Sequence, residues 1–250
     1  MSQGINDILL RFSEGTTFKA LKDHLVDKGV QQISGLVGSS IAINAAALFN
    51  TTNFSQVLIA LDKEQAAYLQ NDLQQLLPEQ KVLFYPASHR RPYEIEEVDN
   101  ANVLLRSEVI QTLQQASERV MVVTYADALL EKTISRQQFE KQHLTLKVNE
   151  ALSLDFLNET LFEYEFERVD FVSEPGDFSV RGGILDVYSF SNELPYRIEF
   201  FGDQIESIRT FDPNTQLSVA TIQAIDLVAN IDNRSSDETS ERVPFLSHFD

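Results

Sequence analysis

Cysteine is absent from the 250 residues of the sequence, and histidine is scarce. Without cysteine the chain has no disulfide bond, no cysteine-ligated zinc site and no thiol nucleophile, as is typical of a reducing compartment. The four histidines lie too far apart to predict a metal site; they are His24, His89, His143 and His248. No apolar run approaches the about 20 residues that span a bilayer, and the first residues lack the features of a signal peptide. We therefore expect a cytoplasmic protein with no membrane partner.

Basic residues are also few, with 20 lysines and arginines against 38 acidic residues and a formal net charge of -18. A protein that binds DNA tightly displaces counterions from phosphates and normally carries the opposite balance, so unaided DNA binding is disfavoured. The acidity is uneven, with net charges of -5 over residues 1–132 and -10 over residues 133–230. This change predicts a domain boundary near residue 132.

Residues 1–132 alternate between helical periodicity and short, continuous apolar runs. Such runs are typical of parallel strands that helices bury on both faces. We expect helices around residues 18–25, 43–48, 69–76 and 103–113, and strands at 57–61, 82–85 and 120–123. Right-handed crossovers would join these strands into one open parallel sheet. The first region is therefore predicted to be an α/β domain.

Residues 133–230 show more two-residue alternation, and their turns contain glycine, proline and aspartate. The clearest element is a hairpin whose strands, 196–201 and 204–209, flank a Gly202-Asp203 turn. This region predicts a smaller α+β domain with an antiparallel sheet. Residues 231–250 are expected to be a linker and the start of a further segment of a longer protein.

A loop at the expected start of a helix partly matches the phosphate-binding P-loop pattern of Gly, four residues, then Gly-Lys-Ser/Thr. Gly35 and Gly38 are present, but the three positions that carry the chemistry are occupied by Ser40, Ile41 and Ala42. The last expected strand, 120–123, ends in Thr124-Tyr125 rather than in an acidic residue that could hold magnesium. We interpret the loop as a degenerate nucleotide loop that has lost tight binding of ATP and Mg²⁺. The plainer alternative is a turn that merely contains glycine.

Two charged clusters have simple explanations. Residues 89–91, His-Arg-Arg, form the only compact basic group, but four acidic residues follow at once, so a solvated loop is favoured over a phosphate or DNA contact. Glu163, Glu165 and Glu167 alternate with aromatic residues and are interpreted as the exposed face of a half-buried strand rather than a paired-carboxylate site.

The hairpin predicts an interaction surface. If the even-numbered residues of 196–201 face the core, Arg197, Glu199 and Phe201 face outward together, because side chains alternate across a strand. Arg181 precedes another expected strand and adds a second positive charge to an acidic domain. Exposed aromatic and arginine residues are typical of binding hot spots. The alternative, in which a neighbouring helix covers Phe201, remains open on the pattern alone.

Two segments carry both arginines and both glycine-containing turns, namely GDFSVRGGILDVY (176–188) and LPYRIEFFGDQIESIRTFD (194–212). They closely resemble the signature shared by UvrB and the bacterial transcription-repair coupling factors. The degenerate loop favours the coupling-factor family, as does the direct path from residue 85 to the helix expected at 103, with no tyrosine-rich DNA-clasping hairpin between them. The resemblance covers essentially the whole chain.

This resemblance implies a fold and a function that the residues alone do not supply. Residues 1–132 would correspond to UvrB domain 1a with a decayed nucleotide site, residues 133–230 to domain 2, and residues 231–250 to the start of domain 1b. The positions that contact UvrA in the family match Arg181, Arg197 and Phe201, which favours an exposed Phe201.

The implied function is that of a non-catalytic adaptor that recruits UvrA to lesion-stalled RNA polymerase in nucleotide excision repair. The remaining domains of the same polypeptide would supply the ATP-driven translocase, its ATP and Mg²⁺, and the contacts to RNA polymerase and DNA. No cofactor is expected for this segment. The alternative is a nucleotide-binding P-loop domain, of the ATPase or helicase type, in a UvrB-like DNA repair protein.

Overall fold

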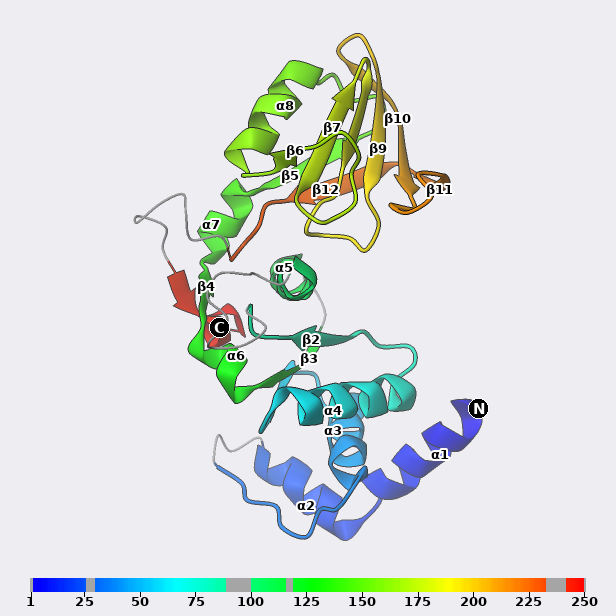
Figure 1. Cartoon of the computed structure of the whole chain (residues 1–250). Helices are drawn as coiled ribbons and strands as arrows, with labels where there is room; N and C mark the ends of the chain where they lie inside the picture. Colours follow the sequence, from blue (N-terminus) through cyan, green and yellow to red (C-terminus); the bar gives the residue numbers. More distant parts are fainter. Residues whose placement is uncertain (1, 26–29, 89–99, 116–118, 233–241, 250) are drawn as a thin grey trace. The chain divides into compact units, whose positions relative to one another are not determined.

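A computed structural model of the chain describes residues 2–25, 30–88, 100–115, 119–232 and 242–249 (Figure 1). The chain forms two compact units, and each unit combines separate stretches of sequence. The first contains Met1–Pro86 and Gln115–Leu129, and the second contains Ala87–Gln114 and Leu130–His248. The predicted division at residues 132 and 230 stays a prediction. Within the described ranges, no helix has the length and apolar character needed to cross a membrane.

A three-stranded parallel sheet lies at the centre of the first unit. Its strands follow the order β1-β3-β2, so the last strand in the sequence is the middle one. All five residues of β3 and all four of β2 are buried. The three expected strands are confirmed; they are β1 (Gln56–Ala60), β2 (Val82–Tyr85) and β3 (Met121–Tyr125).

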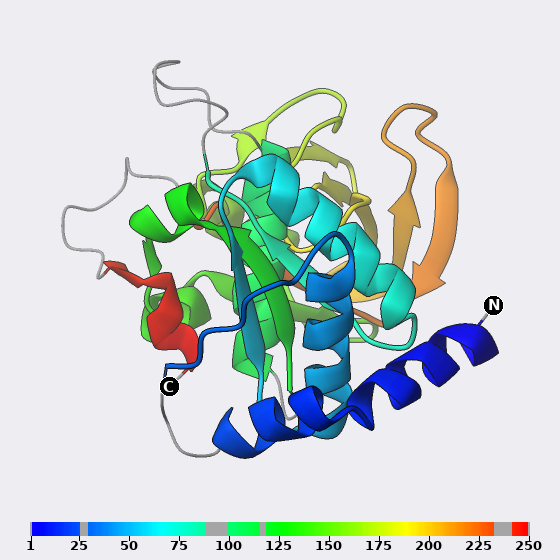
Figure 2. The ribbon, with the colours of Figure 1, turned by 90° about the horizontal axis from the view of Figure 1, so that it is seen from below.

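Helices account for most of the other described residues of the first unit. The helix α4 packs against all three strands and against α3 (Figure 2). Asp62 caps α4 by accepting a hydrogen bond from the backbone N–H of Gln65 at 2.8 Å. Leu73 is fully buried on the inner face of α4, in agreement with the predicted periodicity. The helices are α1 (Ser2–Ser13), α2 (Thr16–Leu25), α3 (Ser40–Thr51), α4 (Lys63–Leu76) and the short α6 (Ala126–Leu130).

The expectation that every parallel strand is buried on both faces is wrong for β1. Ile59 is 54% exposed, and Leu61, just beyond the strand, is 78% exposed. β1 lies at an edge of the sheet, where it pairs only with β3 among the described strands, but this position does not explain the exposure, because β2 lies at the opposite edge and all four of its residues are buried. An apolar run alone does not show whether both faces of a strand are covered.

The second unit is built around a six-stranded sheet with the order β11-β10-β9-β8-β7-β6. Neighbouring strands are antiparallel except for the β6–β7 pair, which is parallel. The predicted hairpin is confirmed, because Phe201 pairs with Gln204 across the two-residue turn and Gly202 adopts φ 61°. The strands are β6 (Glu167–Arg168), β7 (Asp177–Arg181), β8 (Ile184–Val187), β9 (Tyr196–Phe201), β10 (Gln204–Phe211) and β11 (Ser218–Ile222).

The remaining elements complete the second unit. Two further antiparallel pairs, β4 with β13 and β5 with β12, lie outside the six-stranded sheet. The elements are β4 (Lys132–Ile134), β5 (His143–Lys147), β12 (Ala224–Val228), β13 (Arg242–Pro244), α5 (Asn100–Gln115), α7 (Arg136–Lys141), α8 (Leu154–Glu163) and the 3₁₀ helix η1 (Phe245–Phe249). The chain is thus mixed α/β, with a parallel sheet in one unit and mainly antiparallel pairing in the other. That the first unit is a degenerate P-loop domain stays a prediction.

The strand expected around Glu163, Glu165 and Glu167 is wrong. Glu163 is the last residue of α8, Glu165 has a positive φ of 61°, and only Glu167 begins a strand. The helix forms because Leu157 and Leu161, four residues apart, are both buried on one face. At the end of this helix, acidic and aromatic residues alternate with the two-residue period that is typical of a strand, and this alternation led to the wrong prediction.

A buried ion-pair network connects four segments of the second unit. The guanidinium of Arg106 on α5 is fully buried and donates to the carboxylate of Asp232 from Nε at 2.7 Å and from Nη2 at 3.0 Å. Its Nη1 lies 3.3 Å from the carboxylate of Glu131, which also accepts a hydrogen bond from the backbone of Ser88. A buried arginine is tolerated only when carboxylates neutralise it in this way.

Replacing Arg106 with alanine should lower the free energy of unfolding by about 3–5 kcal/mol, because Asp232 would remain buried without its bidentate partner. Urea denaturation followed by circular dichroism measures this change. The control is Arg11→Ala, which removes an exposed ion pair to Asp7 and should change stability by about 0.5 kcal/mol or less. Equal urea midpoints for Arg106→Ala and wild type would show that the network does not stabilise the fold.

Tyr196, at the start of β9, is 7% exposed and faces the core of the second unit. Its pKa is raised from 10 to about 12, mainly by burial; a hydrogen bond with Ser191 lowers this pKa, and the negative charge of Asp226 contributes to the rise. The phenol therefore stays protonated in the folded protein at a pH where it ionises in the unfolded chain.

This difference in pKa predicts an alkaline loss of stability. Below pH 10 the contribution of Tyr196 is fully present, and it is lost as the pH rises from about 10 to about 12, with a total of about 3 kcal/mol. When denaturation is measured at a series of alkaline pH values, the free energy of unfolding should decline less steeply with pH for Tyr196→Phe than for wild type. Tyr68→Phe, at a 76% exposed position, should follow the wild-type curve. Parallel curves for all three proteins would contradict the assignment.

Candidate protein-docking site

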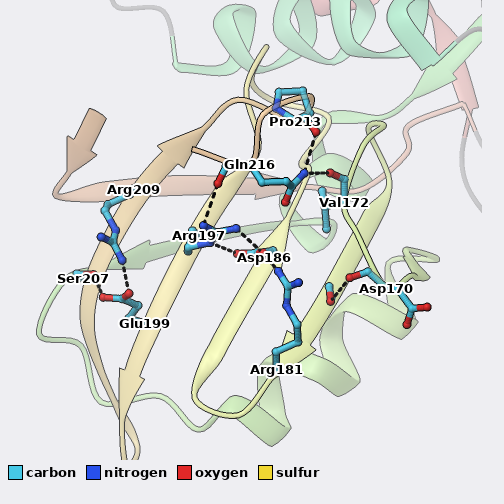
Figure 3. Close-up of polar contacts among 11 residues, drawn as sticks. Asp170, Val172, Arg181, Asp186, Arg197, Glu199, Ser207, Arg209, Pro213 and Gln216 are labelled. Atoms are coloured by element: carbon cyan, nitrogen blue, oxygen red, sulfur yellow. Dashed lines mark hydrogen bonds and ion pairs between the residues drawn. The ribbon is translucent and has the colours of Figure 1, made fainter. Parts of the chain in front are cut away.

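Two hairpins bring the predicted binding arginines onto one face of the six-stranded sheet (Figure 3). Gly182 adopts φ 61° in the turn between β7 and β8, so that Arg181 lies opposite Ile184. On the next strand, Arg197 pairs directly with Asp186. Side chains opposite one another in neighbouring strands share a face, so Asp186 and Arg197 lie on the same side of the sheet.

Asp186 holds both arginines. Its carboxylate is fully buried and accepts hydrogen bonds from Arg197 Nε at 2.7 Å and Nη2 at 2.9 Å, and from Arg181 Nη2 at 2.6 Å. The hydrogen bond to Asp186 is the main cause that raises the pKa of Arg197. Charge-assisted, partly bidentate bonds of this kind fix the direction of both guanidiniums.

The two arginines differ in how much they can offer a partner. The side chain of Arg197 is only 18% exposed; it also donates to the backbone carbonyl of Gln216 at 3.3 Å and lies 4.6 Å from the centre of the Phe211 ring. The side chain of Arg181 is 45% exposed. Arg181 therefore presents more of its guanidinium to solvent, while Arg197 lies closer to the body of the domain.

Phe201 is 78% exposed at the end of β9. Its two preceding neighbours on the same side of the strand, Arg197 and Glu199, are partly buried. No helix covers Phe201 in the part of the chain that the structure describes, so the alternative with a buried Phe201 does not hold there. Its role in docking stays a prediction.

A second ion pair lies on the same face. Arg209 on β10 is opposite Arg197, and it donates from Nη2 to the carboxylate of Glu199. Ser207 Oγ donates to the other oxygen of Glu199 at 2.7 Å. Together with Asp186 and Arg181, these residues form a cluster of three arginines and two carboxylates. The five side chains sum to a charge of +1 on a chain whose net charge is -18.

Sequence analysis did not identify Asp186 or Arg209 as part of this surface. Asp186 was visible as the third residue after the Gly182-Gly183 turn, but its contact with Arg197 depends on the register between β8 and β9. No local pattern fixes that register, because a long connection separates the two strands. A regular hairpin with this two-residue turn would place Arg209 opposite Tyr196, and it is the β-bulge between Ile205 and Ser207 that shifts the register and brings Arg209 opposite Arg197.

The degenerate nucleotide loop belongs to the first unit. Gly35 and Gly38 have positive φ values of 83° and 56°, and α3 begins at Ser40, as expected for a turn that opens a helix. Ile41, where a P-loop has lysine, is 47% exposed, and the methyl group of Ala42, where a P-loop has a magnesium-binding hydroxyl, is buried. No strand is formed in residues 30–39, directly before this helix.

Two further sequence candidates concern the basic cluster and metal binding. The basic cluster at residues 89–91 lies outside the described residues. Among the residues that the structure describes, no three histidine or acidic side chains are grouped so as to hold a metal ion.

Comparison with known proteins identifies the family of the second unit. The family model of the UvrB interaction domain matches residues 144–232, which include Arg181, Asp186, Arg197, Phe201 and Arg209. The chain is a homologue of transcription-repair-coupling factors. The resemblance found in the sequence is therefore confirmed.

The relatives extend this similarity over most of the chain. A transcription-repair-coupling factor from Bacillus subtilis (strain 168) is 31% identical over 224 residues, or 89% of this chain, and one from Myxococcus xanthus is 32% identical over 234 residues, or 91%. A third, from Escherichia coli (strain K12), is 28% identical over 204 residues, or 81%. The chain spans about a fifth of the length of these relatives, with 19%, 20% and 18% of each covered. The similarity concerns their N-terminal part.

The geometry of Asp186 leads to a prediction. Replacing it with asparagine removes the charge that holds two guanidiniums, so the free energy of unfolding should fall by about 1–3 kcal/mol. Urea denaturation measures the loss, and Glu206→Gln, which removes a negative charge at an exposed position of β10, is the matched control. If Asp186→Asn is as stable as Glu206→Gln, the carboxylate is not the anchor of this face.

Proposed function

We propose that this chain is a non-catalytic adaptor of a transcription-repair-coupling factor and that its second unit docks UvrA during nucleotide excision repair. The observation that carries the proposal is the presentation of Arg181 by the buried Asp186, with Phe201 exposed on the same face, inside the segment that matches the UvrB interaction domain. The docking surface is defined as Arg181, Asp186, Arg197 and Phe201.

The docking surface is prepared for binding before a partner arrives. Because Asp186 already fixes the guanidiniums, less side-chain freedom is lost on association. Carboxylates of UvrA would accept the free N–H groups of Arg181, and an apolar pocket would take up the ring of Phe201. The partly exposed guanidinium of Arg181 would favour acidic partner surfaces, whereas the acidic remainder of the chain would repel them.

The first unit supports a non-catalytic role. An exposed isoleucine and a buried alanine occupy the positions where a P-loop places its lysine and its hydroxyl, so neither phosphate neutralisation nor magnesium binding is provided. Under this proposal, ATP and Mg²⁺ act in the parts of the relatives that this chain does not cover. RNA polymerase and DNA would be bound there as well, and UvrA would be recruited to a stalled polymerase in the cytoplasm.

Calorimetric titration with UvrA tests the proposal. Wild type should bind, and Arg181→Ala, Arg197→Ala and Phe201→Ala should each weaken binding by about 1–3 kcal/mol, because each truncation removes a charged or apolar anchor. Matched controls in the same unit are Arg136→Ala and Phe156→Ala, which alter exposed residues on α7 and α8 and should bind as wild type does. Circular dichroism verifies that each variant is folded.

Two results would contradict the proposal. Absence of binding by folded wild type would remove the docking function. Saturable, magnesium-dependent binding of ATP in the micromolar range would instead support the alternative of a nucleotide-binding P-loop domain.

A further inference from the structure

A second exposed phenylalanine lies beside the docking surface, on a loop that is fixed in place. Phe171, between β6 and β7, is 65% exposed. Its neighbours are anchored: the carbonyl of Asp170 accepts a hydrogen bond from Ser179 Oγ at 3.2 Å, and the carbonyl of Val172 accepts one from Gln216 Nε2 at 3.1 Å. Val172 is fully buried, in one cluster with Tyr188 and Phe211. The exposure of Phe171 is therefore built into an ordered loop.

Phe171 is directly connected to Arg181. The guanidinium carbon of Arg181 lies 5.4 Å from the centre of the Phe171 ring, within the range of a cation–π interaction. The same guanidinium donates to Asp186 at 2.6 Å. Arg181 is thus held by a buried carboxylate and lies over an exposed ring, and the loop that carries Phe171 is on the arginine-bearing face of the sheet.

The strand order places Phe171 and Phe201 on opposite sides of Arg181. The loop of Phe171 follows β6, the neighbour of β7 on one side, whereas Phe201 ends β9, two strands from β7 on the other side. Since β7 and β9 are both antiparallel to β8, Arg181 and Phe201 lie at the same end of the sheet. Two strand spacings separate β7 from β9 by about 10 Å, and Phe201 lies two residues beyond Glu199, the residue of β9 that is level with Arg181.

We propose that Phe171 is a second aromatic anchor of the docking surface and that it contacts UvrA directly. The inference rests on the proposed function. The partner surface that fits this arrangement is a carboxylate with apolar side chains on both sides: the carboxylate pairs with Arg181, and the apolar groups cover Phe171 and Phe201. A partner with carboxylates alone would leave both rings in water.

Aromatic anchors on opposite sides of Arg181 would also determine the orientation of the bound partner. An ion pair at Arg181 together with one apolar contact leaves the partner free to pivot about the line between them. A third contact on the far side of the arginine removes this freedom, and it discriminates against acidic surfaces that lack the second apolar group. Phe171 therefore contributes specificity as well as affinity.

Binding measurements provide the first test. Phe171→Ala should raise the Kd for UvrA about tenfold, as expected for loss of a contact worth about 1.4 kcal/mol. Phe156→Ala is the matched control, because Phe156 is 48% exposed on α8, and α8 packs on the other face of the sheet through the contact of Phe162 with Phe178. Thermal melting verifies that both variants stay folded.

A site-specific label provides the second test, because the chain contains no cysteine. Phe171→Cys and Phe156→Cys are each coupled to an environment-sensitive thiol-reactive dye before UvrA is added. Burial of position 171 should shift its emission to shorter wavelength, while the label at position 156 should not respond. This readout reports contact at the position itself, which a purely structural role in holding Arg181 would not produce.

The outcomes separate this inference from the proposed function. If Phe201→Ala weakens binding but Phe171→Ala does not, or if the label at position 171 gives no shift in the complex, the second anchor is overturned and the docking function stands. If folded wild type does not bind UvrA, the docking function fails and the second anchor fails with it. The proposal is supported if Phe171→Ala raises the Kd about tenfold and if the emission shifts for the label at position 171 but not for the label at position 156.

Discussion

The candidate site depends on one buried carboxylate. Asp186 on β8 has no exposed surface. It accepts three hydrogen bonds from two arginines on β7 and β9, the strands on either side of β8. A buried negative charge is costly without such partners, so the arginines stabilise Asp186 while Asp186 orients the arginines. The orientation of the two arginines is thereby coupled to folding, because it requires the correct pairing of β7, β8 and β9.

Local sequence patterns predicted most elements of the fold and only part of the site. The three parallel strands and the 196–209 hairpin were predicted because hydrophobic runs, alternation and the Gly202-Asp203 turn are encoded within short windows. The exposure of β1 was missed because a short apolar run does not show which faces of a strand the rest of the fold covers. The contact of Asp186 with Arg197 was missed because it depends on register across a long connection. Both omissions concern non-local contacts, which no short window contains.

The docking surface combines exposed aromatic rings with arginines that are paired with carboxylates. A chain with a net charge of -18 carries a cluster in which three arginines are paired with two carboxylates, so each arginine is already partly neutralised within the protein. Arg197 and Arg209 are opposite each other, an unfavourable arrangement that Asp186 and Glu199 compensate. Apolar rings beside such a face supply affinity that does not depend on charge, so electrostatics and burial have separate roles.

The strand order of the first unit has a consequence for the order of folding. β1 and β2 are not neighbours, because β3 lies between them, and β3 follows α5, which belongs to the second unit. During synthesis, β1 and β2 therefore lack the partner strand that they share in the described structure until residue 125 has left the ribosome. The first 85 residues cannot complete their own sheet, and the two units become stable as interleaved parts of one chain rather than as successive domains.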